Sequence, residues 1–160
     1  PWLVKDAKND IGFYFLGREE GFTFVTTEPV FASNGMAVAR VFRERDGVSR
    51  FRLVYEEAPL VGVDLERADQ VLPFGHRLLV LTNLESLSFR YFGYSSAVTR
   101  GMGMDDERSV EASAKWLTNF DGLDAGLNPL RVGMNLNGTE FEFELPSTGD
   151  VSAARAAVPL

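Results

Sequence analysis

Few side chains in this sequence have a type and spacing that could do chemistry. His76 is the only imidazole, and it lies between Gly75 and Arg77, a setting typical of a turn rather than of a catalytic site. The chain has no cysteine, which excludes thiol catalysis, disulfides and thiolate metal ligands. No nucleophile elbow, phosphate-binding loop or dinucleotide fingerprint occurs in it. The sequence therefore predicts a protein that is not an enzyme.

Carboxylates gather in two places where they could hold calcium. Asp64 and Glu66 would share one face of a strand, and Asp105, Asp106 and Glu107 follow one another in a polar segment. Neither group has the spacing of a dedicated calcium loop. We therefore expect solvated acids at both places, and no cofactor.

Apolar side chains in polar or terminal surroundings are the better candidates for a functional surface. Met102 and Met104 lie in a glycine-containing segment, where flexible thioethers either form an adaptable contact surface or turn back onto the core. Trp2, Leu3 and Val4 lie at the start of the sequence, where they could end an interaction helix. We predict that these residues contact a partner.

Length, charge and hydropathy limit the classes of function. With 160 residues, 45% of them hydrophobic, the chain is long enough for one globular domain with a core. A net charge of -7 would repel nucleic-acid phosphates, so no nucleic-acid partner is expected. No apolar run approaches the roughly 20 residues that span a bilayer.

Alternating segments predict a mainly β fold built from antiparallel sheets. In the stretch 84–93, Leu87, Phe89 and Tyr91 alternate with serine and arginine, as in a strand with one buried face. The other predicted strands are residues 11–16, 22–26, 36–43, 51–55 and 77–82, with 60–74 as a further edge strand.

Two turn signals predict which strands are neighbours. Asp46-Gly47 separates two alternating runs and favours a hairpin, and Asn137-Gly138 favours a two-residue type I′ turn. That turn predicts a register with an apolar and a charged face. The predicted pairs are Leu136 with Thr139, Met134 with Phe141, Val132 with Phe143, Leu130 with Leu145, Asn135 with Glu140 and Arg131 with Glu144.

Composition divides the chain into a globular domain of residues 1–146 and a tail of residues 147–160. Pro146 ends the last strand, and the residues after it carry too little apolar bulk to pack, so we expect a flexible tail. Residues 94–115 are expected to form a long loop, with a short helix from Asp106 into Trp116.

Several stretches of this chain follow one another in a distinctive order. They are Phe15-Leu16-Gly17, Gly21 to Thr26, Glu28-Pro29, the block from Arg77 to Gly93, Lys115-Trp116 after a loop, and Asn128 to Val132 before the final hairpin. In this order they resemble the J-type minor pseudopilins of the bacterial type II secretion system (general secretion pathway protein J family). Phe120 stands where that family often has a second tryptophan, and the resemblance covers most of residues 13–145.

The resemblance implies a pilin-like, β-rich periplasmic domain behind an apolar N-terminal helix that is held in the inner membrane. That helix would precede Pro1, so contact with the membrane is expected only through a segment missing from this sequence. In the family, the J type is a structural subunit of the pseudopilus tip. Its implied partners are the I-type and K-type minor pseudopilins and the major pseudopilin.

Two other functions remain open at this point. A minor pilin of a type IV pilus shares the anchor helix and the β-rich domain. A secreted β domain that binds a sugar or a lipid would instead follow an ordinary signal peptide. The sequence upstream of Pro1 separates the pilin-like alternatives from the secreted one.

Overall fold

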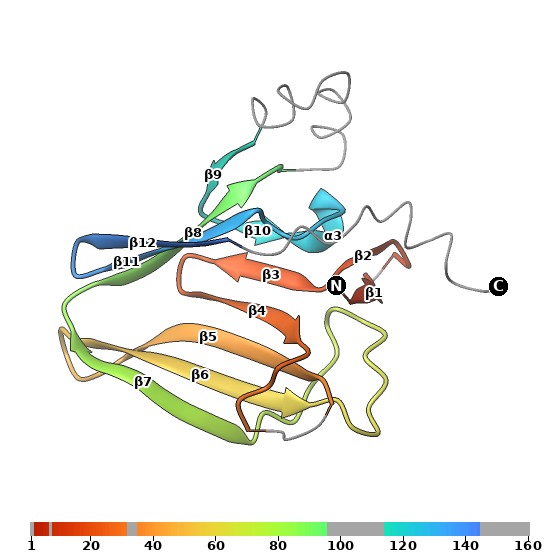
Figure 1. The fold of residues 1–160 in the computed structure, drawn as a ribbon, viewed down its shortest axis with the longest axis horizontal. Coiled ribbons are helices and arrows are strands. Elements are labelled where there is room, and N and C mark those ends of the chain that lie inside the picture. The colour runs from red at the N-terminus through yellow and green to blue at the C-terminus, as the bar shows by residue number, and fades with distance from the viewer. Residues whose placement is uncertain (1, 7, 32–34, 96–113, 145–160) are drawn as a thin grey trace.

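The computed structural model describes residues 2–6, 8–31, 35–95 and 114–144, which form antiparallel sheets and one short helix (Figure 1). This confirms the mainly β class that the sequence predicts. Within these ranges, no helix is long and apolar enough to cross a membrane.

Two large sheets and one small sheet make up the described part of the fold. The six-stranded sheet has the spatial order β10 (Phe120–Asp121), β3 (Phe15–Arg18), β4 (Gly21–Thr26), β5 (Ala37–Arg45), β6 (Phe51–Pro59), β7 (His76–Leu84). The four-stranded sheet has the order β12 (Thr139–Glu144), β11 (Arg131–Leu136), β8 (Leu87–Gly93), β9 (Lys115–Leu117). The small sheet pairs β1 (Leu3–Lys5) with β2 (Ile11–Phe13), and the helix α3 (Gly122–Ala125) follows β10.

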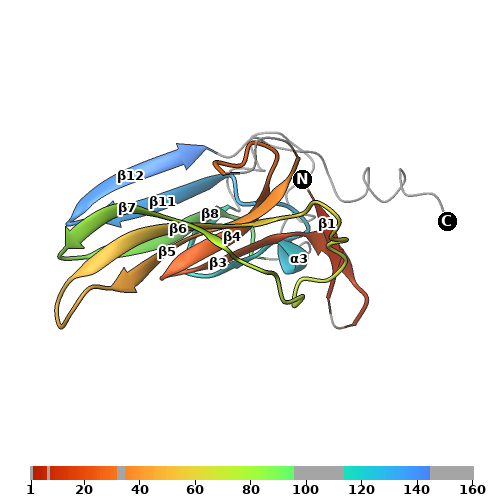
Figure 2. The same ribbon diagram turned by 90° about the horizontal axis from the view of Figure 1, so that it is seen from below.

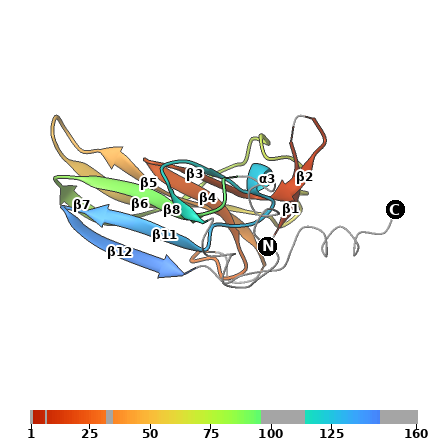
Figure 3. The same ribbon diagram turned by 90° about the horizontal axis from the view of Figure 1, so that it is seen from above.

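The main core lies between the two large sheets. Figures 2 and 3 show β11 and β12 on one side of the larger sheet. Tyr91 of β8 meets Phe15 of β3 edge to face, with 5.8 Å between ring centroids, and Phe15 meets Phe120 in the same way at 5.9 Å. Such pairs add to the free energy gained by burying the rings. The other buried members are Leu53, Leu84, Leu87, Phe89, Ala125 and Val132.

The last hairpin has the register that the Asn137-Gly138 turn predicts. All five of its predicted pairs within residues 131–144 are present, and both turn residues have positive φ, 50° and 84°. Leu145 lies outside the described residues, so its pairing with Leu130 stays a prediction. The hairpin around Asp46-Gly47 is also confirmed, with its turn closed by Asp46 N–H donating to the carbonyl of Arg50.

The predicted strand within residues 84–93 is confirmed with a later start. Leu87, Phe89 and Tyr91 are buried, as their alternation predicts. Leu84, however, ends β7. The chain then passes from the six-stranded sheet to the four-stranded sheet through Glu85 and Ser86.

Three sequence predictions about local structure are wrong. Residues 60–74 form no extended strand. Gly62 has φ 72°, and the segment is joined to β1 by a bridge from Arg67 to Lys5, while its Leu65 packs against Val4, Tyr14 and Val38. Residues 11–16 are divided between two strands, because residues 11–13 pair with β1 whereas residues 15–16 belong to β3 and pair with β4. Trp116 lies in β9 and not at the end of a helix.

Candidate functional site

Strand β7 exposes a continuous apolar run. Leu78, Leu79, Val80 and Leu81 are between 39% and 46% exposed. Within the larger sheet, β7 is an end strand that pairs with β6 alone. An apolar strand at the free edge of a sheet is a template for pairing with another chain. We call Leu78–Leu81 the β7 edge.

Strand β12 exposes two phenylalanines at the end of the other sheet. Phe141 is 43% exposed and Phe143 is 50% exposed. They pair with Met134 and Val132, which contact the core, so both rings lie on the face directed toward the larger sheet. We call Phe141 and Phe143 the β12 pair. The sequence predicts this apolar face correctly, but not that the other sheet leaves half of each ring uncovered.

The opposite face of the last hairpin is charged. Arg90 Nη2 lies 2.6 Å from Glu140 Oε2, and Arg131 Nη1 lies 3.4 Å from Glu142 Oε2. Gly133 leaves room for the side chains of Arg90 and Trp116 on this charged face. A Cβ on Gly133 would lie 2.8 Å from Cγ of Arg90 and 3.1 Å from the ring of Trp116. Exposed pairs of this kind contribute little to stability, so the layer is best understood as a solvated face.

A network of charged side chains links β7 to β5 and β6. Arg77 contacts Glu44 at 2.5 Å and Glu56 at 3.1 Å, and Arg52 contacts the same Glu44. Hydrogen bonds from Arg77 and Arg52 lower the pKa of the Glu44 carboxyl. Glu56, which is mostly buried, also pairs with Arg40 of β5. The network keeps β7 in register with its one neighbour in the sheet.

A fully buried carboxylate lies beside the start of β7. Glu57 accepts hydrogen bonds from the hydroxyl of Tyr55 and from the backbone N–H groups of Val30 and Phe31. Burial and the neighbouring carboxylate of Glu57 raise the pKa of Tyr55. The ring of Phe31 stacks on His76, with 5.5 Å between centroids. Through these contacts, Glu57 of β6 and His76 of β7 fix the position of Val30 and Phe31 against the sheet.

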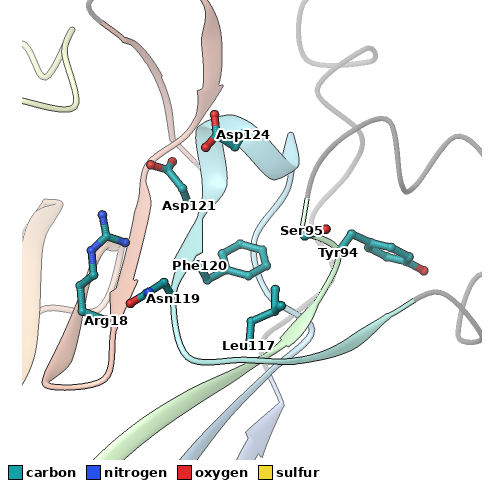
Figure 4. A pocket seen from close by; sticks show the side chains of 8 residues that line it. All are labelled: Arg18, Tyr94, Ser95, Leu117, Asn119, Phe120, Asp121 and Asp124. Atoms are coloured by element: carbon teal, nitrogen blue, oxygen red, sulfur yellow. The ribbon is translucent and has the colours of Figure 1, made fainter.

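A pocket of about 420 Å³ opens beside β10 (Figure 4). Arg18 of β3 lies on the same side of it as Asn119, Asp121 and Asp124, and Tyr94 and Ser95 lie on the other side, with Phe120 between them. Asp121 Oδ1 caps α3 by accepting the N–H of Leu123. Mixed donors and acceptors of this kind suit a neutral polar ligand better than a strongly charged one.

The N-terminal residues predicted to bind a partner pack against the chain itself. Val4 is 2% exposed in a second core cluster with Tyr14 and Leu65, and Trp2 Nε1 donates to the Leu65 carbonyl at 2.9 Å. Leu3 is half-buried and pairs with β2. Contact of these residues with a partner stays a prediction, as does contact through Met102 and Met104, which lie outside the described residues.

Of the acids considered for calcium, Asp64 and Glu66 lie within the described residues. Asp64 and Glu66 lie in the irregular segment 60–74, so they do not share a strand face as predicted. Asp105, Asp106 and Glu107 lie outside the described residues. Within the described part of the chain, no group of three or more acidic or histidine side chains is arranged to hold a metal.

Sequence reasoning missed the residues of greatest interest here. The run Leu78–Leu81 is a visible signal, but four consecutive apolar residues usually indicate a strand buried on both faces. Glu57 has a signal too, as a second acid in an apolar strand. No family model, curated protein or solved structure matches this chain.

Proposed function

We propose that this chain is the periplasmic domain of a J-type minor pseudopilin, a structural subunit of the tip of the type II secretion pseudopilus. The β12 pair is the observation that carries this proposal. Two phenylalanine rings left half-exposed at a sheet edge are typical of a surface that a protein partner covers. The order of sequence stretches described above supports the family.

The proposal assigns assembly rather than catalysis to the domain. Its partners are the I-type and K-type minor pseudopilins and the major pseudopilin. An N-terminal apolar helix that precedes Pro1 anchors the full-length protein in the inner membrane, and the β domain lies in the periplasm with a pilin-like arrangement. The antiparallel two-sheet architecture is compatible with that arrangement.

Co-purification with the I-type and K-type soluble domains of the same bacterium tests the proposal. The wild-type chain should form a complex at micromolar concentration. Replacing both Phe141 and Phe143 with lysine should abolish it, because two charges would enter the apolar contact. Glu144→Lys, on the same strand and exposed but on its opposite face, is the matched control and should bind normally. A folded wild-type chain that binds neither domain would contradict the proposal.

A gene deletion separates the secretion system from a type IV pilus. Loss of this protein should abolish export of type II substrates while leaving surface pili intact. The opposite result would assign the chain to a type IV pilus as a minor pilin. Restoration of export by the wild-type gene, but not by the variant with lysines at 141 and 143, would connect the phenotype to the β12 pair.

The pocket beside β10 favours a second candidate, a secreted domain that binds a sugar. Arg18, Asn119 and Asp121 offer donors and acceptors around an opening of about 420 Å³. Titration of the labelled chain with neutral mono- and disaccharides, followed by NMR, tests this. Shifts confined to the residues of the pocket, lost in Asn119→Ala, would favour sugar binding. Unchanged spectra at millimolar sugar would exclude it.

A further inference from the structure

The turn of the last hairpin places an asparagine and a following glycine in contact with water. Asn137 and Gly138 are both exposed, and no atom lies within 4 Å of the place that a Cβ on Gly138 would take. The backbone nitrogen of a residue without a Cβ is unhindered. It can attack the side-chain amide of the preceding asparagine when the two groups meet, and this attack leads to loss of ammonia.

That deamidation would run in two steps. The Gly138 nitrogen loses its proton and forms a bond to Cγ of Asn137, the Cγ–Nδ2 bond breaks, and ammonia leaves behind a five-membered succinimide ring. Water then opens one of the two ring carbonyls. Opening at Cγ gives aspartate, whereas opening at the backbone carbonyl gives isoaspartate, whose main chain is one carbon atom longer. Water is the only reagent that the two steps consume.

The closed turn keeps the two reacting atoms apart. Asn137 has φ 50° and Gly138 has φ 84°, as in a type I′ turn, whose first central residue has a ψ of about 30°. At that angle, Cβ of Asn137 and the nitrogen of Gly138 lie on opposite sides of the Cα–C bond. The nitrogen therefore points away from Cγ, and attack requires a rotation of ψ that opens the turn.

Hydrogen bonds hold both reacting groups in the closed arrangement. Asn137 Oδ1 accepts the N–H groups of Glu85 and Ser86, at 2.8 and 3.2 Å, and the N–H of Asn137 donates to the Ser86 carbonyl at 3.0 Å. The N–H of Gly138 donates to Oδ1 of Asn135 at 3.0 Å. The turn is thus fixed to the β7–β8 connection, and the Asn137 amide cannot reorient without losing these contacts.

We propose that Asn137 is a deamidation site that reacts only while the last hairpin is open, and that isoaspartate formed there keeps the turn from closing again. A two-residue turn fixes the register of its strands through the length of backbone that it contains. The extra carbon atom of isoaspartate changes that length and displaces the groups that bond to Glu85 and Ser86. The modification does not depend on the secretion function proposed above.

Peptide mapping by mass spectrometry tests the site and its dependence on opening. The wild-type chain is kept at mildly alkaline pH, either folded or unfolded in guanidinium chloride. The peptide with Asn137 is followed separately from the one with Asn34, the other asparagine that precedes a glycine. Deamidation at Asn137 should be at least about tenfold slower in the folded chain. Equal rates in the two states, or no reaction at Asn137 in the unfolded chain, would overturn the proposal.

Asn135→Ala tests the protection in the folded chain. It removes the acceptor of the Gly138 N–H and leaves the reacting pair unchanged, so deamidation should become about three- to tenfold faster. Glu140→Ala, opposite Asn135 on the same face of the hairpin, is the matched control and should react at the wild-type rate. Equal rates in the two variants would overturn the claim that the closed turn protects Asn137.

The purified isoaspartate form tests the consequence of the modification. Asn137→Asp is the matched control, because it has the same charge, a normal backbone and an oxygen that still accepts the two N–H groups. The isoaspartate form should unfold at a lower urea concentration than Asn137→Asp does. Equal midpoints would overturn the claim that isoaspartate keeps the turn from closing.

Discussion

Gly17 lies directly against the ring of Tyr91. A Cβ built on Gly17 would lie 2.6 Å from Cζ of that ring, closer than any real contact allows. The hydroxyl of Tyr91 reaches past Gly17 and lies 2.7 Å from the carbonyl oxygen of Arg18 and 2.9 Å from that of Gly21, which share its one proton. Gly17 of β3 thus makes room for Tyr91 of β8, which connects the four-stranded sheet to the six-stranded sheet.

Gly17→Ala should therefore destabilise the domain, because the added methyl group must displace Tyr91 or the backbone. We expect a loss of about 1–3 kcal/mol in the free energy of unfolding, measured with urea. Gly75→Ala is the matched control, since its nearest neighbour would be an oxygen 3.9 Å away. Equal stability of the two variants would contradict the close contact.

The pKa of Tyr91 predicts a loss of stability at high pH. Burial of the ring raises this pKa above its ordinary value of 10.0, so the folded state holds the phenolic proton more tightly than the unfolded state does. The resulting stabilisation is complete below pH 10 and declines as the pH rises above it.

Tyr91→Phe isolates this contribution. The slope of unfolding free energy against pH above 10 should become shallower, by at most about 1.4 kcal/mol per pH unit. Tyr55 and Tyr14, whose pKa values burial also raises, account for part of the remaining slope. An unchanged slope would mean that the Tyr91 hydroxyl titrates normally in the folded protein.

Glu57→Gln should destabilise the domain although the two side chains have the same shape. The carboxylate accepts from Tyr55 and two backbone N–H groups, and an amide nitrogen in its place cannot accept. A buried donor left without its acceptor costs about 1–3 kcal/mol. Glu140→Gln at the exposed hairpin is the control, and its effect on urea unfolding should be near zero.

Gly138→Val should weaken the last hairpin. The residue has φ 84°, in the left-handed region that a β-branched side chain resists, and the expected cost is about 1–2 kcal/mol. Thr139→Val adds the same side chain next to the turn with ordinary strand geometry and should be harmless. A melting temperature that is equal in both variants would argue against the type I′ turn.

Local patterns predicted those parts of the fold that neighbouring residues decide. The Asn137-Gly138 dipeptide specifies its turn because both φ angles are positive, and the register of the hairpin follows by counting. The alternation of Leu87, Phe89 and Tyr91 is likewise a property of one strand. The division of residues 11–16 between two sheets was not predictable in this way, because it depends on which distant strand lies beside each part: β1 beside residues 11–13 and β4 beside residues 15–16.

The candidate surfaces depend on contacts between distant parts of the chain. The sequence by itself determined that Leu78–Leu81 form an apolar strand and that Phe141 and Phe143 share one face of a hairpin. Only the tertiary structure decided that β7 and β12 end their sheets and that the opposing sheet covers these side chains incompletely. The physical reason is that backbone geometry within one strand decides which side chains point to the same face. The exposed fraction of those side chains depends instead on which strand lies next to that strand and on how far the facing sheet extends.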